Sequence, residues 1–424
     1  MRNPVRKIAL FALIQVMFLA ACGGGSNDLA AGSSGSTAST GANVTQITVD
    51  GGPTAAAGDF NIPFISVTLC APGSTTNCQT IDHVEVDTGS YGLRIISSAI
   101  SPSLLAALPM ETTPTLNVPI VECTIFGDGF TWGSMRKADL QIASEKASSI
   151  PMQVIGDADF PNIPTDCSNT GASEDTVADF GANGILGVGP FVQDCGDTCA
   201  NGTTEPIIYY ACATGGGTCN ATQVPLAEQA SNPVASFTTD NNGVIVELPA
   251  IADGGSGTIT GSLVFGIGTE SNNGLGSATV LTTDNVYGYI TTTYKNTQYT
   301  ESFLDSGSNL IFLNDSTITT CTIGSSTSST VGNNTFFCPT SELTLTAVNQ
   351  GQNGTQSSVT FKIGDAQTEL GNNSFVAFEN LGAPAFAGQN LTFDFGLPFF
   401  YGRHVFTAID GMNTSGGTGP YFAY

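Results

Sequence analysis

The sequence contains the stretch Val84-Glu85-Val86-Asp87-Thr88-Gly89-Ser90 and repeats its pattern at Ser302-Phe303-Leu304-Asp305-Ser306-Gly307-Ser308. Each copy runs from an apolar, strand-like segment into Asp, a small hydroxyl residue, Gly and Ser. One such tetrapeptide is weak evidence, because a chain rich in Gly, Ser and Thr should contain about 0.1 copies by chance. Two copies, one in each half of the chain, indicate a duplicated loop. The alternative is a pair of ordinary turns, because Asp, Gly and Ser all favour turns.

The duplicated pattern resembles the signature of pepsin-like aspartic peptidases, which carry Asp-Thr/Ser-Gly-Ser/Thr in each of two lobes. The resemblance implies that Asp87 and Asp305 are facing catalytic carboxylates. Two like charges at close range do not both ionise easily, so the pair is expected to hold one shared proton over a broad pH range. The chain also resembles an uncharacterised family of bacterial lipoproteins with the same two signatures.

The other residues of the two loops are expected to support the aspartates. The hydroxyl residue after each Asp would bond across to the opposite loop, and the last Ser of each loop would bond to an outer carboxylate oxygen. The glycines would let the two backbones approach each other. The supporting residues implied by the resemblance are Thr88, Gly89, Ser90, Ser306, Gly307 and Ser308.

A glycine-rich segment between the two signatures resembles the flap hairpin that closes over the substrate in this family. The residues expected at the flap and the substrate cleft are Phe126, Gly127, Asp128, Gly129 and Trp132. For Asp128 the alternative is an ordinary turn residue. For Trp132 it is an aromatic residue of the flap or the core.

The order of the remaining segments follows the same family. Residues 183–189 resemble the Ile-Leu-Gly segment that passes behind the first catalytic loop. Residues 261–268 resemble the strand that opens the second lobe, and residues 287–294 the strand before its catalytic hairpin. Residues 395–401 and 405–410 resemble the closing elements. The likeness therefore extends over most of residues 60–424.

Three features depart from the family. Tyr91-Gly92-Leu93-Arg94 replaces the usual Asn-Leu-Trp after the first signature, and Phe126 replaces the flap tyrosine. The hydrogen bond between tyrosine and tryptophan that braces the flap therefore cannot form between these positions. The cysteine-rich insert at residues 194–220 has no counterpart that can be placed.

The first residues predict export. A basic start is followed by an apolar run at residues 8–20, which is the layout of a secretory signal. The run ends at Leu19-Ala20-Ala21-Cys22, a sequence typical of bacterial lipoproteins that are cleaved and acylated on cysteine. An ordinary signal peptide is the alternative. We expect a signal at residues 1–21, lipidation of Cys22, and a flexible tether at residues 22–43.

Glycine, rather than aspartate, follows Cys22, and in this the sequence resembles lipoproteins that are sent to the outer membrane. We therefore expect a periplasmic protein of the bacterial cell envelope, attached to the outer membrane by its lipid alone. No obvious pro-segment stands between the tether and Phe60, which favours a binding protein over an active peptidase.

Length and composition bound the fold. About 380 residues follow the tether, which suggests two domains, and the many short β-type runs between turn clusters predict a mostly β chain. We expect lobes at residues 44–252 and 253–424, in the two-lobed pepsin-like fold with a cleft between them. The mature chain has seven Lys and Arg against 35 Asp and Glu, a net charge of −28, so nucleic acid is not an expected partner.

Eleven cysteines leave ten once Cys22 is assigned to the lipid. An even number in an oxidising compartment predicts disulfides. Cys70 with Cys78 and Cys321 with Cys338 are the expected pairs, because each pair brackets a loop between strand-like segments. The other six are left unassigned: Cys123, Cys167, Cys195, Cys199, Cys212 and Cys219. A zinc site formed by the last four is the alternative.

The function expected is that of a monomeric aspartic endopeptidase acting on peptides or proteins without metal or cofactor. Serine-hydrolase chemistry needs a histidine beside a nucleophile, and the chain has only His83 and His404, without the accompanying Gly-x-Ser-x-Gly motif. The alternative is a catalytically silent binding lipoprotein that keeps the cleft without turnover.

Overall fold

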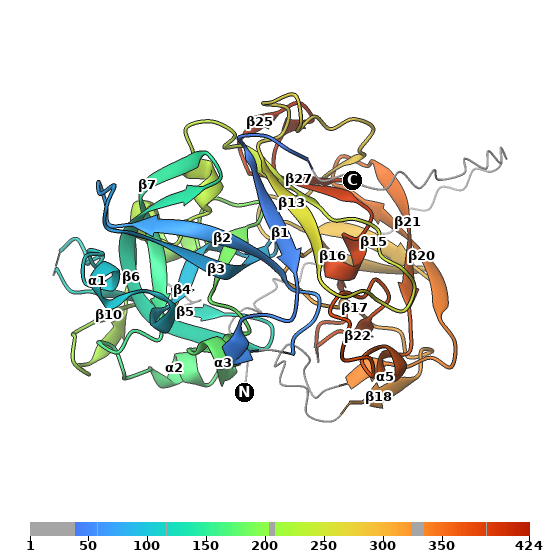
Figure 1. Cartoon of the computed structure of the whole chain (residues 1–424), viewed down its shortest axis with the longest axis horizontal. Helices are drawn as coiled ribbons and strands as arrows, with labels where there is room; N and C mark the ends of the chain where they lie inside the picture. Colours follow the sequence, from blue (N-terminus) through green and yellow to red (C-terminus); the bar gives the residue numbers. More distant parts are fainter. Residues whose placement is uncertain (1–38, 57, 116, 203–207, 324–334, 387) are drawn as a thin grey trace, which may run out of the picture.

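The chain forms two lobes of β-structure, with a central layer of strands between them (Figure 1). The computed structural model describes residues 39–424 except 57, 116, 203–207, 324–334 and 387. The expected signal, Cys22 and most of the tether therefore lie outside the described residues. The predicted fold class, mostly β with two lobes, is confirmed.

The first lobe and the central layer share one continuous sheet. Its strand order is β11-β10-β5-β6-β7-β4-β9-β3-β2-β1-β13-β12-β24-β27-β14, and β8 pairs with β6. The first-lobe strands are β2 (Pro63–Cys70), β3 (Cys78–Asp87), β4 (Tyr91–Ile96), β5 (Ile120–Ile125), β6 (Gly129–Ile142), β7 (Glu145–Ile155), β8 (Ala172–Ser173), β9 (Gly184–Val188), β10 (Tyr209–Cys212) and β11 (Cys219–Ala221). The strands of the central layer are β1 (Val44–Val49), β12 (Gly243–Glu247), β13 (Ile259–Phe265), β14 (Val280–Thr282), β24 (His404–Ala408) and β27 (Tyr421–Ala423).

The second lobe contains a separate sheet in the order β21-β20-β15-β16-β23-β17-β22. In β15, residues Ile290, Thr292 and Tyr294 are buried while the two between them are half-buried, the period of two expected of a strand. The sheet consists of β15 (Ile290–Tyr294), β16 (Thr297–Leu304), β17 (Ile311–Leu313), β20 (Leu343–Gln350), β21 (Gln356–Ile363), β22 (Gly382–Pro384) and β23 (Thr392–Phe395). Two small hairpins add β18 (Thr320–Thr322) with β19 (Thr335–Phe337), and β25 (Asn413–Thr414) with β26 (Gly417–Thr418).

Helices are short and peripheral. They are α1 (Pro102–Leu105), α2 (Thr165–Ser168), α3 (Val177–Phe180), α4 (Asp197–Asn201) and α5 (Ala366–Glu369). Within the described part of the chain, none has the length and apolar character needed to cross a bilayer.

The central layer joins the beginning of the chain to its second half. Strand β1 pairs with β13 along its whole length and touches β2 at its end. The expected lobe boundary between residues 252 and 253 lies in the loop from β12 to β13, and these two strands pair with each other.

Each signature loop is supported by the same three-strand unit. In the first lobe, β9 lies parallel to β3, with Gly187 opposite Asp87, and antiparallel to β4. In the second, β23 lies parallel to β16 and antiparallel to β17. The predicted Ile-Leu-Gly segment thus passes behind the first loop. The closing segment around Phe395 does the same behind the second, so the internal duplication extends from the motif to the fold.

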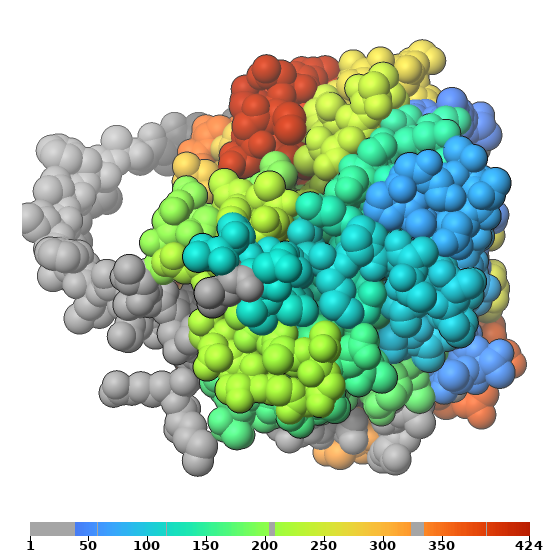
Figure 2. All heavy atoms as spheres, turned by 90° about the vertical axis from the view of Figure 1, so that its left-hand side faces the viewer, coloured from blue at the N-terminus to red at the C-terminus, as the bar shows by residue number. Residues whose placement is uncertain are grey.

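The cysteine-rich insert adds an edge to the first lobe. Its strand β10 pairs antiparallel with β5, so that Tyr209 lies opposite Glu122 and Tyr210 opposite Val121. Figure 2 shows yellow-green residues of this region on the outer face of the first lobe. Because β5 also pairs with β6, it has a strand on each side.

The described cysteines form five disulfides. Both predicted pairs, Cys70–Cys78 and Cys321–Cys338, are confirmed. The remaining bridges are Cys123–Cys167, Cys195–Cys199 and Cys212–Cys219. The zinc alternative is therefore wrong, because all four of its cysteines are oxidised in pairs.

Candidate active site

The two signature loops meet where the lobes join. Asp87 ends β3 and Asp305 follows β16 directly, and the two carboxyls lie close enough for the charge of Asp87 to raise the pKa of Asp305. A Cβ atom added to Gly89 would lie 2.5 Å from the Asp305 carboxyl carbon, and one added to Gly307 would lie 2.7 Å from that of Asp87. Any larger residue would therefore push the opposite carboxyl away, which explains glycine at the third position of both motifs.

A reciprocal pair of hydrogen bonds locks the loops together. The Thr88 amide donates to Ser306 Oγ at 3.1 Å, and the Ser306 amide donates to Thr88 Oγ1 at 2.9 Å. Each hydroxyl then donates to the opposite chain, Thr88 to the Leu304 carbonyl at 3.0 Å and Ser306 to the Val86 carbonyl at 2.6 Å. These cross-bonds are the ones that the sequence predicted for Thr88 and Ser306.

The carboxyl oxygens are held by their own loops, but not symmetrically. The Gly89 amide donates to Asp87 Oδ1 at 2.6 Å, and the Gly307 amide donates to Asp305 Oδ1 at 2.8 Å. Ser308 Oγ lies 3.0 Å from Asp305 Oδ2, as predicted. The matching prediction for Ser90 is wrong, because its buried Oγ has no hydrogen-bond partner among the described residues.

A third carboxyl reaches the pair through Ser308. Ser308 Oγ also lies 2.6 Å from Oδ2 of Asp394, a residue of β23 that is 6% exposed. A hydroxyl has a single hydrogen to donate, so both contacts are hydrogen bonds only if one of the two carboxyls is protonated. The bridge therefore retains a proton next to Asp305.

The electrostatics of the site favour retained protons. Burial raises the pKa of Asp305 well above its usual range, and the charges of Asp87 and Asp394 raise it further. Burial also raises the pKa of Asp394, and the charge of Asp87 adds to this effect. The burial of Asp305 and Asp394 next to other carboxyls therefore favours a proton held within the group.

The flap covers a cavity of about 120 Å³ beside the two aspartates. The tip between β5 and β6 contributes Phe126, Gly127 and Asp128 to its lining, while Gly129 begins β6. A Cβ added to Gly127 would lie 3.5 Å from the ring of Phe386 in the second lobe, so the flap tip and Phe386 line the same cavity with little space between them. The carboxyls lining the cavity belong to Glu85, Asp87, Asp128, Glu174 and Asp305, and the aromatic rings to Phe126, Phe180, Phe312 and Phe386.

Trp132 does not belong to this cavity, which corrects its assignment to the substrate cleft. Its side chain is 2% exposed, donates from Nε1 to the Phe160 carbonyl at 2.8 Å, and packs edge-on against Tyr210. It is therefore a core residue that joins the flap strand to the insert.

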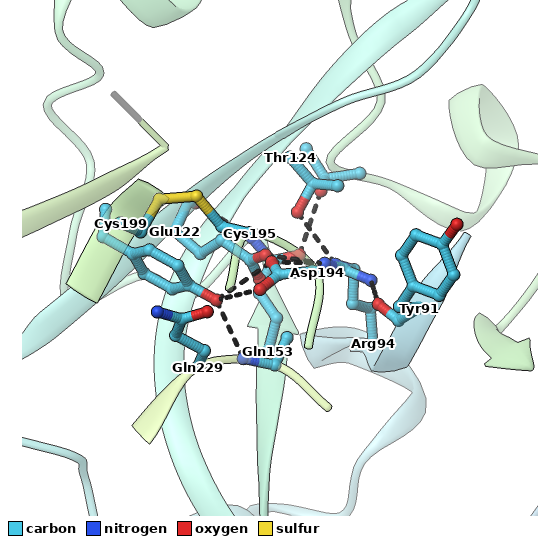
Figure 3. Close-up of polar contacts among 12 residues, drawn as sticks. Tyr91, Arg94, Glu122, Thr124, Gln153, Asp194, Cys195, Cys199 and Gln229 are labelled. Carbon is cyan, nitrogen blue, oxygen red and sulfur yellow. Dashed lines mark hydrogen bonds and ion pairs between the residues drawn. A yellow bond between two sulfur atoms is a disulfide. The ribbon is translucent and has the colours of Figure 1, made fainter. Parts of the chain in front are cut away.

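Arg94 braces the flap strand from inside the first lobe (Figure 3). Its Nε donates to Thr124 Oγ1 at 2.8 Å, two residues before Phe126. Its Nη2 forms ion pairs with Glu122 at 2.6 Å and Asp194 at 3.2 Å. The side chain is 1% exposed, so this charged network lies inside the first lobe and ties β4, β5 and the insert together.

Sequence reasoning missed Glu85, Glu174 and Asp394. Glu85 had a usable signal, because residues two apart in a strand share a face and Glu85 lies two before Asp87. Asp394 lies directly before the closing segment at residues 395–401. It was missed because the corresponding Leu-Gly-Asp-x-Phe pattern of pepsin-like peptidases has its aspartate after the glycine, whereas Asp394 precedes Gly396. Glu174 and Phe386 lie in irregular segments, where the sequence contains no periodicity to show their direction.

The two lobes, the matched strand units and the crossed loops together form the pepsin-like fold that the sequence predicted. A search of curated proteins finds no match. Among solved structures, an aspartic proteinase from Irpex lacteus matches with a TM-score of 0.49 and 15% identity, over 90% of this chain and 96% of that chain. A family model described as a protein of unknown function, DUF3443, matches residues 39–424. The chain belongs to the DUF3443 family.

Proposed function

We propose that this chain is an aspartic endopeptidase, which hydrolyses peptide bonds with a water activated between Asp87 and Asp305. The observation that carries the proposal is the mutual placement of the two loops, in which each glycine lies against the opposite carboxyl. The reciprocal bonds of Thr88 and Ser306 fix that placement. Such rigidity suits a reaction whose catalytic groups must be positioned before the substrate binds.

The two carboxyls have different roles in the proposed reaction. Ionised Asp87 takes a proton from the water, whose oxygen attacks the peptide carbonyl. Protonated Asp305, whose pKa is raised by burial, gives its proton to the carbonyl oxygen. Collapse of the tetrahedral diol breaks the C–N bond as the nitrogen takes a proton from Asp87 and one of the diol hydroxyls returns a proton to Asp305, which restores both carboxyls. The substrate lies extended between the lobes, beneath the flap tip at Phe126.

The proposal is tested with Asp87→Asn and Asp305→Asn. Each substitution keeps size and hydrogen bonding but removes the base or the acid, so turnover should fall about 10²- to 10⁴-fold with an unchanged circular dichroism spectrum. Cleavage of a mixed peptide library is followed by mass spectrometry from pH 3 to 8. The control is Asp166→Asn, an exposed residue of α2. Equal turnover in the wild type and both dyad variants would overturn the proposal.

The second candidate function is a silent peptide-binding protein. It is favoured by the small volume of the cavity, which is about 120 Å³, and by the ring of Phe386, which lines that cavity together with the flap tip. An inhibitor of the pepstatin type, with a tetrahedral hydroxyl, should raise the melting temperature of an active enzyme and raise it less in either dyad variant. Binding of peptides without cleavage at any pH in the range would favour the silent protein.

We further propose that the mature protein is monomeric and anchored to the outer membrane through a lipid on Cys22. Support comes from the basic start, the apolar run and the Leu-Ala-Ala-Cys sequence. Cys22→Ser should abolish labelling with a radioactive fatty acid and release the protein from the membrane fraction. Unchanged labelling would contradict the anchor.

A further inference from the structure

Three carboxyls converge on one side of the cavity without taking part in the proposed reaction. Glu85 lies on the same face of β3 as Asp87, two residues before it. Asp128 lies at the flap tip, and Glu174 follows β8, which pairs with β6 at Gly129. All three line the same cavity as the two aspartates. A side chain held by these carboxyls would therefore belong to a residue that flanks the scissile bond.

Glu174 has an unused acceptor. Its side chain is 4% exposed, and Oε1 has no hydrogen-bond partner among the described residues. The carboxyl of Asp128 lies close enough for its charge to raise the pKa of Glu174. A Cβ on Gly129 would lie 2.5 Å from Oε1, so glycine at this position of the flap makes room for the carboxyl. A buried acceptor left unpaired costs free energy, which a donor from a bound molecule would recover.

The surroundings of these carboxyls suit a long side chain with a positive end. Phe126 and Phe180 pack edge-on with ring centroids 5.9 Å apart, and Phe312 and Phe386 stack at 5.4 Å on the second-lobe side. Aromatic faces attract cations and cover the methylene groups of lysine or arginine. The residues that line the cavity include no Lys, Arg or His. The protein itself therefore supplies no positive charge at this point.

We propose that Glu85, Asp128 and Glu174 form a subsite that selects substrates with a lysine or arginine side chain beside the scissile bond. The inference that the subsite selects cleaved substrates rests on the proposed peptidase function. The binding of a positive side chain at the subsite does not depend on that function. A metal ion fits less well, because the described residues contain no group of three or more side chains suited to hold one. The bound ammonium or guanidinium donates to Glu174 Oε1 and lies between the aromatic walls.

The empty subsite holds protons that a cation would displace. Burial raises the pKa of Glu174 to about 9, and Asp128, Asp175 and Asp179 add to the effect. Burial also raises the pKa of Glu85 and of Asp128. A positive side chain stabilises the ionised carboxyls. Its binding near neutral pH should therefore release about one proton, whereas an uncharged side chain of equal length should release none.

The test compares matched peptides on the full mature chain. Binding is measured calorimetrically to Asp87→Asn protein, in buffers of different ionisation enthalpy, with lysine or norleucine placed in turn at each central position. At one position, lysine should bind about 10- to 100-fold more tightly than norleucine and release a proton. Both effects should be lost in Asp128→Asn and in Glu174→Gln. Exposed Asp166→Asn is the charge-matched control and should retain them.

The outcomes separate this inference from the proposed function. Equal affinity for lysine and norleucine at every position overturns the subsite, even if the wild type cleaves both peptides. A lysine preference that depends on Asp128 or Glu174 supports the subsite, even if the wild type cleaves neither peptide. Two variants are used because Asp128 is partly exposed at the flap tip, so Asp128→Asn can report if Glu174→Gln fails to fold. A preference that persists in Asp128→Asn and in folded Glu174→Gln also overturns the assignment.

Discussion

Ser308 has a larger part in the site than its place at the end of a signature suggests. Its hydroxyl lies between Asp305 and Asp394, and with one hydrogen it cannot donate to both. A proton on either carboxyl completes the chain of hydrogen bonds. The unit that holds protons in the cleft is therefore the aspartate pair together with Asp394, and its titration belongs to the group as a whole.

The first prediction concerns Asp394→Asn, which keeps the shape of the bridge and removes the third acid. The charge of Asp394 raises the pKa of Asp305, so its removal should let the pair lose its shared proton at lower pH. In a plot of kcat/KM against pH, measured with one peptide substrate, the alkaline limb should therefore move to lower pH. Asp166→Asn should leave the limb in place. A limb that stays fixed or moves to higher pH in Asp394→Asn would contradict this role.

At the level of elements, strand β5 of the flap is held from both sides and from inside the lobe. It pairs with β6 on one side and with β10 of the insert on the other. Arg94 reaches it from β4 through Thr124 and Glu122, and Asp194 joins the same guanidinium from the insert (Figure 3). The bracing therefore ends just before the tip, since Phe126 and Gly127 lie beyond β5.

The second prediction concerns Arg94→Met. The substitution keeps the volume of the stem but leaves Glu122 and Asp194 buried without their cation, so unfolding free energy should fall by about 3–5 kcal/mol. Urea unfolding measures the loss. Lys137→Met is the control, because Lys137 pairs with Glu111 at a partly exposed site and should cost about 1 kcal/mol or less. Similar losses in the two variants would show that the Arg94 network does not stabilise the flap.

The third prediction concerns the disulfides. The ten described cysteines are all paired, so titration of the unfolded, unreduced mature protein should detect essentially no free thiol. Removing the bridge between Cys321 and Cys338 with a double serine variant should lower unfolding free energy by about 3 kcal/mol, because that bridge closes a loop of 17 residues. Detection of several free thiols would contradict the pairing. An unchanged unfolding free energy in the double serine variant would contradict the stabilising role of the bridge.

Local sequence pattern predicted the elements that repeat and missed those that depend on distant pairing. Segment 183–189 was assigned correctly because its apolar pair and glycines identify it without knowledge of its partner. Strand β10 was not found, because its partner β5 lies far away in sequence and the insert has no repeat. Trp132 was placed at the cleft from the resemblance to the flap hairpin, and the alternative of a core aromatic is the correct one. The pattern could not show the direction of the ring, because the first eight residues of β6 are all buried. A strand buried on both faces loses the alternation that tells one side from the other.

The whole molecule combines a large acidic surplus with many carboxyls removed from water. Burial raises the pKa of carboxyls in both lobes, and Glu85, Asp194, Asp305 and Asp394 are shifted well above their usual range. Each of these groups binds a proton more tightly in the folded protein than in the unfolded chain. The unfolding free energy should therefore decrease as pH rises, over a wide range of pH.

The last prediction follows from the sign of that linkage. A carboxyl with a raised pKa in the folded state stabilises fully below its unfolded pKa, and its contribution is lost as pH rises through the folded value. For Glu174 this window runs from about 4.5 to about 9. The melting temperature should thus fall steadily from pH 4.5 to 9. Each proton retained only by the folded state adds a slope of up to about 1.4 kcal/mol per pH unit.

Glu174→Gln isolates one part of this slope. The variant cannot ionise at this position, so the dependence of its stability on pH should be flatter than that of the wild type, with the largest gain in stability at the alkaline end. Asp166→Asn also removes one negative charge from the chain, but its exposed carboxyl should leave the slope unchanged. Thermal unfolding of the three proteins across the window measures the difference. A melting temperature that rises with pH, or equal slopes in Glu174→Gln and Asp166→Asn, would show that the buried carboxyls do not store these protons.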